Sequence, residues 1–401
     1  MKIAHVVPYF SPKLGYQEYY LAKYEKDAGD VGNDVCVITS DREYPGLVHY
    51  FFKHRIIPCG VRYEQGVLTY RLPSVFESAS LPNATIVRGL KEALFRFRTD
   101  IVHAHSALDI LTLLVCFWKK DIGYKLVVDL HVLPVFSGSF SQLKHLYYMF
   151  YKNFVFTYLI AGRVDSFLAI SPAVFRWFIK ELHVPPSKVY FTPLGADTHL
   201  FKRNEKVRKL IRKRLGVKDD DVLIVYAGKI IVEKDVHVLV RALCYLAKKY
   251  ENLKLLLIGA GDERYTAKLL SVARAGQALD RIILKGFIPH HELYKYYSAS
   301  DIGVWPGSPS ITIIEAMSTG LPIVIAKTDL TSHLLANGNG YNFDGGNWKE
   351  LSRSLEKLIA SGELRQEMGL KSRELVVRKL SWDVISKQTL EIYKNIARAR
   401  R

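Results

Sequence analysis

Short apolar runs that alternate with longer amphipathic stretches are the feature that most constrains the fold of this chain. The first run, Ile3–Val7, is followed by a loop with two prolines and a glycine, and then by a helical pattern over Gln17–Ala28. Repeated runs of this kind indicate a parallel sheet covered by helices on both faces. The strands predicted in the first half are Ile3–Val7, Val35–Thr39, Ile101–His103, Lys125–Asp129, Ser166–Ile170 and Lys188–Phe191.

The same alternation begins again after a junction at residues 198–218. The strands predicted there are Asp221–Tyr226, Lys254–Ile258, Arg281–Leu284, Ile302–Val304 and Ile323–Ile325. Two such series predict an α/β fold with two Rossmann-like, doubly wound domains that face each other across a cleft. Because ligands of doubly wound sheets bind beyond the carboxyl ends of the strands, we expect a site for two substrates.

The charge of the chain is strongly basic. Its 401 residues include 57 lysines and arginines against 39 aspartates and glutamates, which gives a formal net charge of +18. Much of the excess lies in Lys202–Arg214 and Lys371–Arg401, and each stretch is either a solvated helix face or a surface for anionic lipid or a phosphorylated substrate. A nucleic-acid-binding protein is a further interpretation, although no aromatic–basic RNA motif or zinc-ligand spacing accompanies the charge.

Composition and targeting signals narrow the class further. Hydrophobic residues make up 49% and charged residues 24%, which excludes a largely disordered or collagen-like chain. No apolar run reaches the roughly 20 residues of a membrane-spanning helix, and the N-terminus lacks a signal-peptide pattern. The four cysteines form no Cys-x-x-Cys pair, which argues against a disulfide framework or a zinc site. We expect a cytoplasmic protein, with peripheral contact to the inner face of the plasma membrane as an open alternative.

Three segments of the second half combine residues that suit a phosphorylated ligand. The first ends a predicted strand and contains Gly228, Lys229 and Lys234, whose charges can neutralise a leaving diphosphate. The second, Gly286–Pro289, is a loop after a strand that can hold a nucleobase by main-chain hydrogen bonds. The third, Gly307–Pro322, is a Gly/Ser/Pro loop that leads into a helix with one carboxylate, and such a helix N-terminus is suited to phosphate.

In their order and spacing these segments resemble the retaining glycosyltransferases of family 4, which have the GT-B fold. The resemblance covers nearly the whole chain, and its strength comes from the joint order of blocks that are individually weak. The matching blocks are Pro8–Pro12 with Gly15 and Glu18, Asp100–Ser106, Ile170–Ser171, Pro193–Asp197 with Phe201, Gly228, Lys234, Gly286–Pro289 with Asp301, Glu315–Pro322, and Asn339–Gly340.

The resemblance implies roles for several of these residues. Lys234 corresponds to the lysine that contacts the donor diphosphate, and Lys229 stands where the family usually has arginine, so the charge is kept without the two-pronged guanidinium. Glu315 corresponds to the second glutamate of the family's E-x7-E motif, which holds the donor ribose. The first glutamate, which contacts the donor sugar, is replaced by Gly307, and this departure bears on sugar recognition and on activity.

Further roles follow from the same resemblance. The backbone amides of Ile311 and Thr312 are expected at the diphosphate, and Ser308 or Ser310 is expected to replace the missing glutamate in part. Gly15 corresponds to the loop glycine that lets the first domain approach the donor phosphates. The expected donor-binding residues are Gly15, Gly228, Phe287, Ile288, Pro289, Ser310, Ile311, Thr312 and Glu315.

The candidate residues of the first domain are histidines. His131 follows a predicted strand and corresponds to a family histidine beside the reacting sugar, whereas His103 and His105 follow an earlier strand and are weaker candidates. For each, a structural role in the interior is the alternative. The expected catalytic residues are therefore Lys229, Lys234 and His131.

Together the sequence and the resemblance predict a retaining, nucleotide-sugar-dependent hexosyltransferase. We expect a UDP-hexose donor rather than GDP-mannose, a lipid-linked or cell-envelope glycan as acceptor, no metal or other cofactor, and no nucleic-acid partner. The expected domains are an acceptor-binding domain over 1–200, a donor-binding domain over 201–378, and a last helix over 379–401 that crosses back to the first. A non-catalytic GT-B protein that binds a sugar nucleotide or supports a partner is the alternative prompted by Gly307.

The aromatic stretch Leu143–Tyr158 is predicted to be a helix. Its apolar residues are spread around the helix, whereas an interfacial helix usually has a distinct charged face. We expect it to cover the sheet and to form part of the acceptor cleft, with a membrane-edge or sugar-stacking surface as the alternative.

Overall fold

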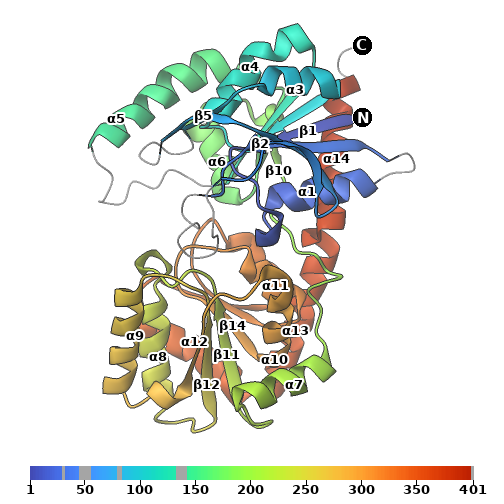
Figure 1. Ribbon diagram of the computed structural model, residues 1–401. Coiled ribbons are helices and arrows are strands. Elements are labelled where there is room, and N and C mark those ends of the chain that lie inside the picture. The colour runs from blue at the N-terminus through green and yellow to red at the C-terminus, as the bar shows by residue number, and fades with distance from the viewer. Residues whose placement is uncertain (29–31, 45–55, 79–83, 132–141, 399–401) are drawn as a thin grey trace. The chain divides into compact units, whose positions relative to one another are not determined.

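The structure, a computed structural model, describes residues 1–28, 32–44, 56–78, 84–131 and 142–398 and divides into two compact units (Figure 1). Unit 1 comprises Met1–Pro193 and Asp383–Arg401, and unit 2 comprises Leu194–Trp382, whereas the sequence placed the boundaries at 200/201 and 378/379. The segment after Pro193 belongs to unit 2 because Ala196 pairs with Ser381 there.

Unit 2 contains a six-stranded, entirely parallel sheet in the order β13-β12-β11-β14-β15-β16. This is the order 3-2-1-4-5-6 of a doubly wound dinucleotide-binding sheet. The first five strands match the predicted runs closely, and β16 was not predicted. The strands are β11 (Val222–Ala227), β12 (Leu253–Ile258), β13 (Ile282–Lys285), β14 (Ile302–Trp305), β15 (Ile323–Ala326) and β16 (Gly340–Phe343).

Helices cover both faces of this sheet. On one face α8 packs against α9 and α12, and on the other α10 packs against α7 and α11, which also contacts α13 (Figure 1). The apolar faces of these helices and the strands together form one core. The helices are α7 (Glu205–Leu215), α8 (Val236–Leu246), α9 (Glu263–Ala275), α10 (Leu293–Ala299), α11 (Thr312–Ser318), α12 (Trp348–Ala360) and α13 (Gly362–Leu375), followed by a π-helical segment at Val376–Leu380.

Unit 1 repeats the same winding with an extended sheet, ordered β10-β9-β8-β7-β1-β2-β4-β3. The prediction of a purely parallel sheet is wrong at one edge, where β3 and β4 form an antiparallel pair that the sequence pattern did not reveal. A separate β5–β6 ribbon was also not predicted. The strands are β1 (Lys2–Val6), β2 (Asp34–Ser40), β3 (Gly60–Glu64), β4 (Val67–Leu72), β5 (Ser74–Ser78), β6 (Ala84–Val87), β7 (Ile101–Ala104), β8 (Lys125–Leu130), β9 (Ser166–Ala169) and β10 (Val189–Phe191).

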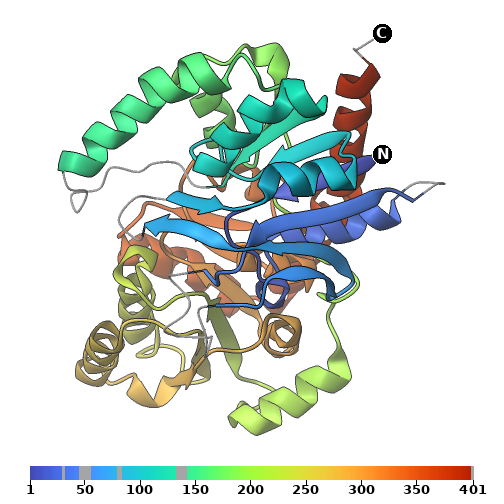
Figure 2. The ribbon, with the colours of Figure 1, turned by 45° about the horizontal axis from the view of Figure 1, so that its top comes forward.

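The two faces of the unit 1 sheet differ in character because side chains alternate along each strand. Ala4, Val102 and Val128 belong to an apolar core with residues of α3 (Leu90–Phe97) and α4 (Ile110–Ile122). The intervening residues include His5, His103 and Asp129, which contact polar groups of α1 (Gln17–Asp27) and α14 (Trp382–Arg398). Figures 1 and 2 show α14 beside β1. The remaining helices of unit 1 are α5 (Gln142–Phe150) and α6 (Pro172–Lys180).

The aromatic stretch is helical, as predicted, but it changes type. After α5 it continues as a π-helix over Tyr151–Ile160, of which Tyr151, Phe156 and Ile160 are buried. Leu146, Phe150, Phe154 and Tyr158 are exposed by 55–72% and recur every four residues. The helix therefore covers the sheet with one face and presents apolar rings on another. No helix in the described part of the chain has both the length and the apolarity to cross a bilayer.

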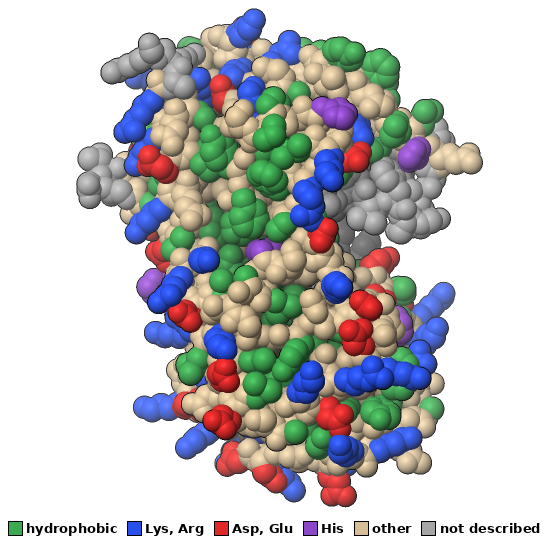
Figure 3. Space-filling model, turned by 180° about the vertical axis from the view of Figure 1, so that it is seen from behind, with side chains coloured by type: hydrophobic (Ala, Val, Ile, Leu, Met, Phe, Trp, Pro, Cys, Tyr) green, Lys and Arg blue, Asp and Glu red, His purple; other side chains and the backbone are tan. Residues whose placement is uncertain are grey.

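The basic stretches are only partly solvated. Within Lys202–Arg214, Arg208 and Arg212 reach into unit 2 and contact the Asp301 carboxylate at 2.7 Å and 3.1 Å. On the face of unit 2 in Figure 3, blue cationic and red anionic side chains are intermingled. Neither Lys202–Arg214 nor this face is a continuous basic patch, because Arg208 and Arg212 form ion pairs inside unit 2.

Candidate functional site

Each sheet reverses its strand order at one point. The reversal lies between β11 and β14 in unit 2 and between β1 and β7 in unit 1. At such a point the helices on the two sides diverge, which leaves room for a ligand beyond the carboxyl ends of the strands. Candidate residues from the sequence lie at these ends in both units.

Gly228 follows β11 at the unit 2 reversal point. Its amide donates to the Ile258 carbonyl at 3.0 Å, and a Cβ atom there would lie 2.9 Å from the Tyr226 hydroxyl oxygen. The Tyr226 hydroxyl donates to the Lys229 carbonyl at 2.6 Å. A side chain at position 228 would therefore displace the Tyr226 hydroxyl, which fixes the course of the backbone that carries Lys229.

Lys229 and Lys234 are two partly buried cations without an ion pair in the described chain. Burial lowers the pKa of both, and in Lys234 burial together with the charge of Lys229 lowers it to about 8. The Lys234 amine donates to the Ser308 and Pro309 carbonyls, each at 2.9 Å. The Glu233 carboxylate partly offsets the charge of Lys234, but two close cations that form no ion pair in the described chain favour an anionic ligand.

Gly307 lies against the backbone of Lys234. A Cβ atom on Gly307 would be 2.5 Å from the Lys234 carbonyl carbon and 2.8 Å from its Cα atom. No side chain fits there unless the backbone moves. The loop packs into the space that a glutamate side chain would need, which is a steric reason for the absence of the motif's first glutamate.

Thr312 and Ser310 fix the loop that follows Gly307. The Thr312 hydroxyl donates to the Ala227 carbonyl at 2.7 Å, accepts from the Trp305 indole at 3.0 Å and lies 2.9 Å from the Ser310 hydroxyl. These bonds join the start of α11 to the end of β11. Because α11 has only seven residues and its N-cap residue, Ile311, provides no side-chain cap, its dipole is small and the two lysines supply the main positive charge.

Glu315 is almost completely buried, with 1% exposure. Its Oε1 atom lies 2.6 Å from His290 Nε2, and its Oε2 atom has no hydrogen-bond partner among the residues that the structure describes. Burial alone would lower the pKa of His290, but the Glu315 carboxylate outweighs it and raises that pKa. A fixed carboxylate with one unpaired oxygen is suited to accept hydrogen bonds from ligand hydroxyl groups.

His290 is a site residue that sequence reasoning missed. It directly follows the predicted loop Gly286–Pro289, and Pro289 precedes the short 3₁₀ turn that begins with His290. Phe287 is 43% exposed, whereas Ile288 packs against the core of unit 2. Adjacency to the predicted loop was the available signal for this histidine.

In unit 1, His131 follows β8 and its Nε2 atom lies 3.0 Å from Asp129 Oδ2. Its side chain is 29% exposed, whereas those of His103, His105 and Asp129 are exposed by at most 1%. Burial alone would lower the pKa of His131, but the Asp129 carboxylate raises it. Sequence reasoning missed Asp129, although its place two residues before His131 on a strand was a signal.

Gly15 ends the 3₁₀ turn Pro12–Leu14 and precedes α1. Its φ of 67° lies in the left-handed region, which favours glycine. This conformation accounts for the residue by local backbone geometry. Its expected role at the donor phosphates stays a prediction.

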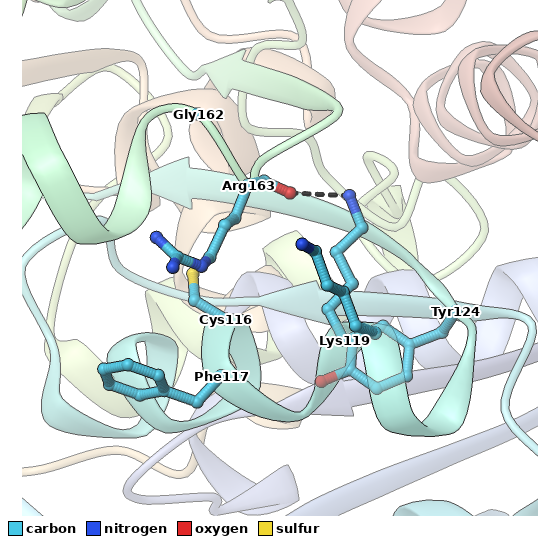
Figure 4. Close-up of a pocket in the computed structure, with 7 residues that line it drawn as sticks. Cys116, Phe117, Lys119, Tyr124, Gly162 and Arg163 are labelled. Atoms are coloured by element: carbon cyan, nitrogen blue, oxygen red, sulfur yellow. Dashed lines mark hydrogen bonds between the residues drawn. The ribbon is translucent and has the colours of Figure 1, made fainter.

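A separate pocket lies at the end of α4, lined by Cys116, Phe117, Lys119, Lys120, Tyr124, Gly162 and Arg163 (Figure 4). The Lys119 amine donates to the Arg163 carbonyl and to Asp165 Oδ2, both at 2.6 Å. None of the predicted site residues lines this pocket. It is therefore no part of the two reversal-point sites.

Comparison with known proteins gives matches to both halves. Residues 19–200 match the profile of "Glycosyltransferase Family 4", and residues 207–375 match that of "Glycosyl transferases group 1". An uncharacterized glycosyltransferase of Methanocaldococcus jannaschii is 26% identical over 59% of the chain, a match that spans 62% of that relative. Alpha-monoglucosyldiacylglycerol synthase of Acholeplasma laidlawii is 22% identical over 87% of the chain and 90% of its own length.

Among solved structures, HepE of Anabaena in complex with UDP superposes with a TM-score of 0.75. The alignment covers 98% of this chain and 100% of HepE at 18% identity. HepE has also been solved with UDP-glucose. At this identity the likeness shows the fold alone, with two Rossmann-like halves.

Proposed function

Because the chain belongs to the family 4 glycosyltransferases and has the GT-B fold, we propose that it transfers a hexose, with retention of configuration, from a nucleoside diphosphate sugar to a hydroxyl group. Unit 2 is the proposed donor-binding unit. The observation that carries the proposal is the partly buried pair Lys229 and Lys234. Neither lysine forms an ion pair in the described chain, although the Glu233 carboxylate acts on Lys234, and two such close cations suit a diphosphate.

Glu315 supports the same assignment for the nucleoside. Its buried, unpaired Oε2 atom can accept hydrogen bonds from a ribose, and His290 holds the carboxylate in place. The exposed ring of Phe287 lies in the loop before His290 and is the proposed contact for the base. The bonds of Thr312 to Ala227 and Trp305 keep the lysine-bearing and glutamate-bearing elements together.

We favour a UDP-hexose as the donor. Support comes from the UDP and UDP-glucose complexes of HepE, a protein of the same fold. The sugar must be recognised without a carboxylate at Gly307, because a side chain there would meet the Lys234 backbone. Ser308 and Ser310 are the proposed polar groups of this loop for the sugar.

The proposed chemistry needs no protein nucleophile. The bond between the sugar C1 atom and the diphosphate oxygen breaks, and a bond from C1 to the acceptor oxygen forms on the same face. The acceptor proton passes to the leaving phosphate, and Lys229 and Lys234 stabilise the developing negative charge. His131 is proposed to donate a hydrogen bond to the reacting sugar. No metal or other cofactor is part of this proposal.

A lipid-linked or envelope glycan is the proposed acceptor, with cytoplasmic enzyme bound peripherally to the membrane. Support comes from the glycolipid synthase of Acholeplasma and from the exposed rings of Phe150, Phe154 and Tyr158. Replacing Phe150 and Phe154 by serine should reduce flotation with vesicles that contain anionic lipid. The matched control is Phe76→Ser, an exposed ring on β5. If the chain itself shows no preference for anionic vesicles, the membrane part of the proposal fails.

The donor is tested by thermal shift with UDP, GDP and ADP and with their hexose conjugates. The proposal predicts the largest shift with UDP ligands, and loss of that shift in Glu315→Ala and Lys234→Met. Glu363→Gln, an exposed residue of α13, is the control. Transfer or donor hydrolysis that is lost in the same two variants distinguishes an enzyme from a non-catalytic sugar-nucleotide-binding protein.

A further inference from the structure

A continuous chain of buried hydrogen bonds runs behind His131 in unit 1. Its links are Glu25 Oε2 to His5 Nε2 at 2.9 Å, His5 Nδ1 to His105 Nε2 at 2.9 Å, His105 Nδ1 to Asp129 Oδ2 at 2.8 Å, and Asp129 Oδ2 to His131 Nε2 at 3.0 Å. This series of hydrogen bonds joins α1, the unit 1 reversal point and β8. Among its members only His131 has a side chain that is more than 1% exposed.

Ring geometry identifies these contacts as hydrogen bonds. His5, His103 and His105 offer nitrogens within 4.8 Å of one another, a spacing that a metal ion could use. However, the His5 and His105 rings are 18° from parallel with centroids 5.1 Å apart, so they lie almost edge to edge. The lone pair of one ring therefore points at the N–H of the other, whereas metal ligands point their lone pairs at a common third position.

The protons on this chain can be assigned from Asp129. Burial alone would raise the pKa of Asp129, but the histidines around it, His131 foremost, hold it well below its ordinary value, so it is ionised. His105 must then donate from Nδ1, and since burial lowers the pKa of His105 to about 3, its Nε2 atom is a bare acceptor. His5 must donate to it from Nδ1. One further proton therefore lies between His5 Nε2 and Glu25 Oε2, on whichever of the two atoms carries it.

Other polar groups, from each neighbouring element, face this series of hydrogen bonds. Gln17 donates to Asp129 Oδ2 at 3.2 Å, and His103 Nε2 lies 3.2 Å from the same oxygen. The Tyr393 hydroxyl of α14 lies 2.7 Å from His103 Nδ1. Glu18 of α1 faces His131, and burial raises the pKa of Glu18 to about 7. In the described part of the chain no lysine or arginine forms an ion pair with these groups.

We propose that Glu25, His5 and His105 are positioning residues that keep Asp129, and through it His131, in one hydrogen-bonding state. The proton between His5 and Glu25 sets the direction of every donor in the chain. Its loss would leave His5 Nε2 bare beside the Glu25 carboxylate. His5 would then donate to Glu25 instead, and His105 would have to turn its proton away from Asp129.

The charge on one buried carboxylate, seven residues and two helical turns from Glu18, thus controls a histidine at the surface of the site. The link from this state to catalysis rests on the function proposed above. The hydrogen-bonding state itself does not, and it can be measured without substrate.

The test uses the full chain with ¹⁵N-labelled histidine and long-range ¹⁵N–¹H correlation spectra from pH 6 to 10. We expect His105 to be neutral with its proton on Nδ1, and His5 to carry a proton on Nδ1. Glu25→Gln should keep both signatures at every pH, because its amide donates to His5 Nε2 and cannot lose that proton. In the wild type both signatures should be lost, and the His131 signals should shift, once the proton between His5 and Glu25 is removed at high pH. Glu92→Gln, an exposed residue of α3, should behave as the wild type does.

The activity arm compares the pH dependence of kcat in the wild type and in Glu25→Gln. The pH dependence of kcat should differ between the wild type and Glu25→Gln, with KM unchanged. A proton on His105 Nε2 in the wild type at pH 6, or His131 signals with the same pH dependence in the wild type and in Glu25→Gln, would overturn the proposal. The same spectra without any transferase activity would leave the positioning network standing and count against the proposed function instead.

Discussion

The two reversal-point sites treat charge in opposite ways. In unit 1, the Oδ2 atom of Asp129 lies within hydrogen-bond distance of His105, His131 and the Gln17 amide, so side chains of the fold itself face the charge of this carboxylate. In unit 2, Lys229 and Lys234 lie close together without an ion pair in the described chain. The same strand order can therefore build two kinds of site. One holds its own side chains in place, and the other needs a bound ligand to balance its charge.

The largest effect is expected when the internal compensation of unit 1 is broken. Asp129→Ala leaves several buried donors without an acceptor and should lower the free energy of unfolding by about 3–5 kcal/mol in urea titrations. The control is Asp121→Ala, since Asp121 is exposed and its pair with Lys91 is worth about 1 kcal/mol at most. Equal losses in the two variants would remove the distinction that we draw between the sites.

The buried pair His290 and Glu315 is the one place in the unit 2 site that resembles unit 1. The folded pKa of His290 lies above its unfolded value, so its contribution is complete below about pH 6.5 and is lost as pH rises through the folded pKa. His290→Gln should therefore cost about 1.5–3 kcal/mol at pH 5.5 and less at pH 9.

The measurement for His290 is urea unfolding at both pH values. His237→Gln serves as control, because the side chain of His237 is 42% exposed. A cost that is independent of pH would mean that the ion pair is not the source of the stabilisation.

The close packing of Gly307 against the Lys234 backbone gives a further test of this comparison. Gly307→Ala forces the Lys234 backbone to move, and overpacking of this kind costs about 1–3 kcal/mol. The same shift should weaken UDP binding, as measured by calorimetry. Gly345→Ala is the matched control, because nothing lies within 4 Å of a Cβ atom there. An alanine variant with unchanged stability and affinity would show that the loop yields freely.

The smallest effect has the opposite sign. Lys229→Met removes a partly buried charge that forms no ion pair with the described residues, so the free protein should be stabilised by up to about 1 kcal/mol while UDP binding weakens. Thermal unfolding with and without UDP measures both effects. If Lys229→Met instead destabilised the free protein, the charge of Lys229 would be stabilised by its neighbours, as the charged groups of unit 1 are.

Much of the fold could be predicted from the sequence, because buried strands of parallel sheets are short continuous apolar runs. The edge strand β3 and its neighbour β4 were missed because Gly60–Glu64 and Val67–Leu72 mix apolar residues with polar and charged ones. The family comparison confirms the predicted resemblance, and the solved structures confirm the GT-B fold. The roles of the individual site residues stay predictions.

The buried partners of the sites could not be predicted, because each comes from a distant part of the chain. Glu25 and His105 meet His5 only after α1 packs on the sheet, and His290 meets Glu315 across 25 residues. Likewise, Gly307 is visible in the sequence as a missing glutamate. Its steric cause requires the position of the Lys234 backbone.

Calorimetric titration of UDP at pH 7 and pH 9.5 tests most directly whether the uncompensated lysines form the donor site. Because the pKa of Lys234 is about 8, the affinity for UDP should be about tenfold lower, or lower still, at pH 9.5 than at pH 7. Binding at pH 9.5 should be accompanied by uptake of a proton. Lys234→Met should bind weakly at both pH values without this difference. UDP affinity that is the same at both pH values in the wild type, or is unchanged in Lys234→Met, would contradict the account.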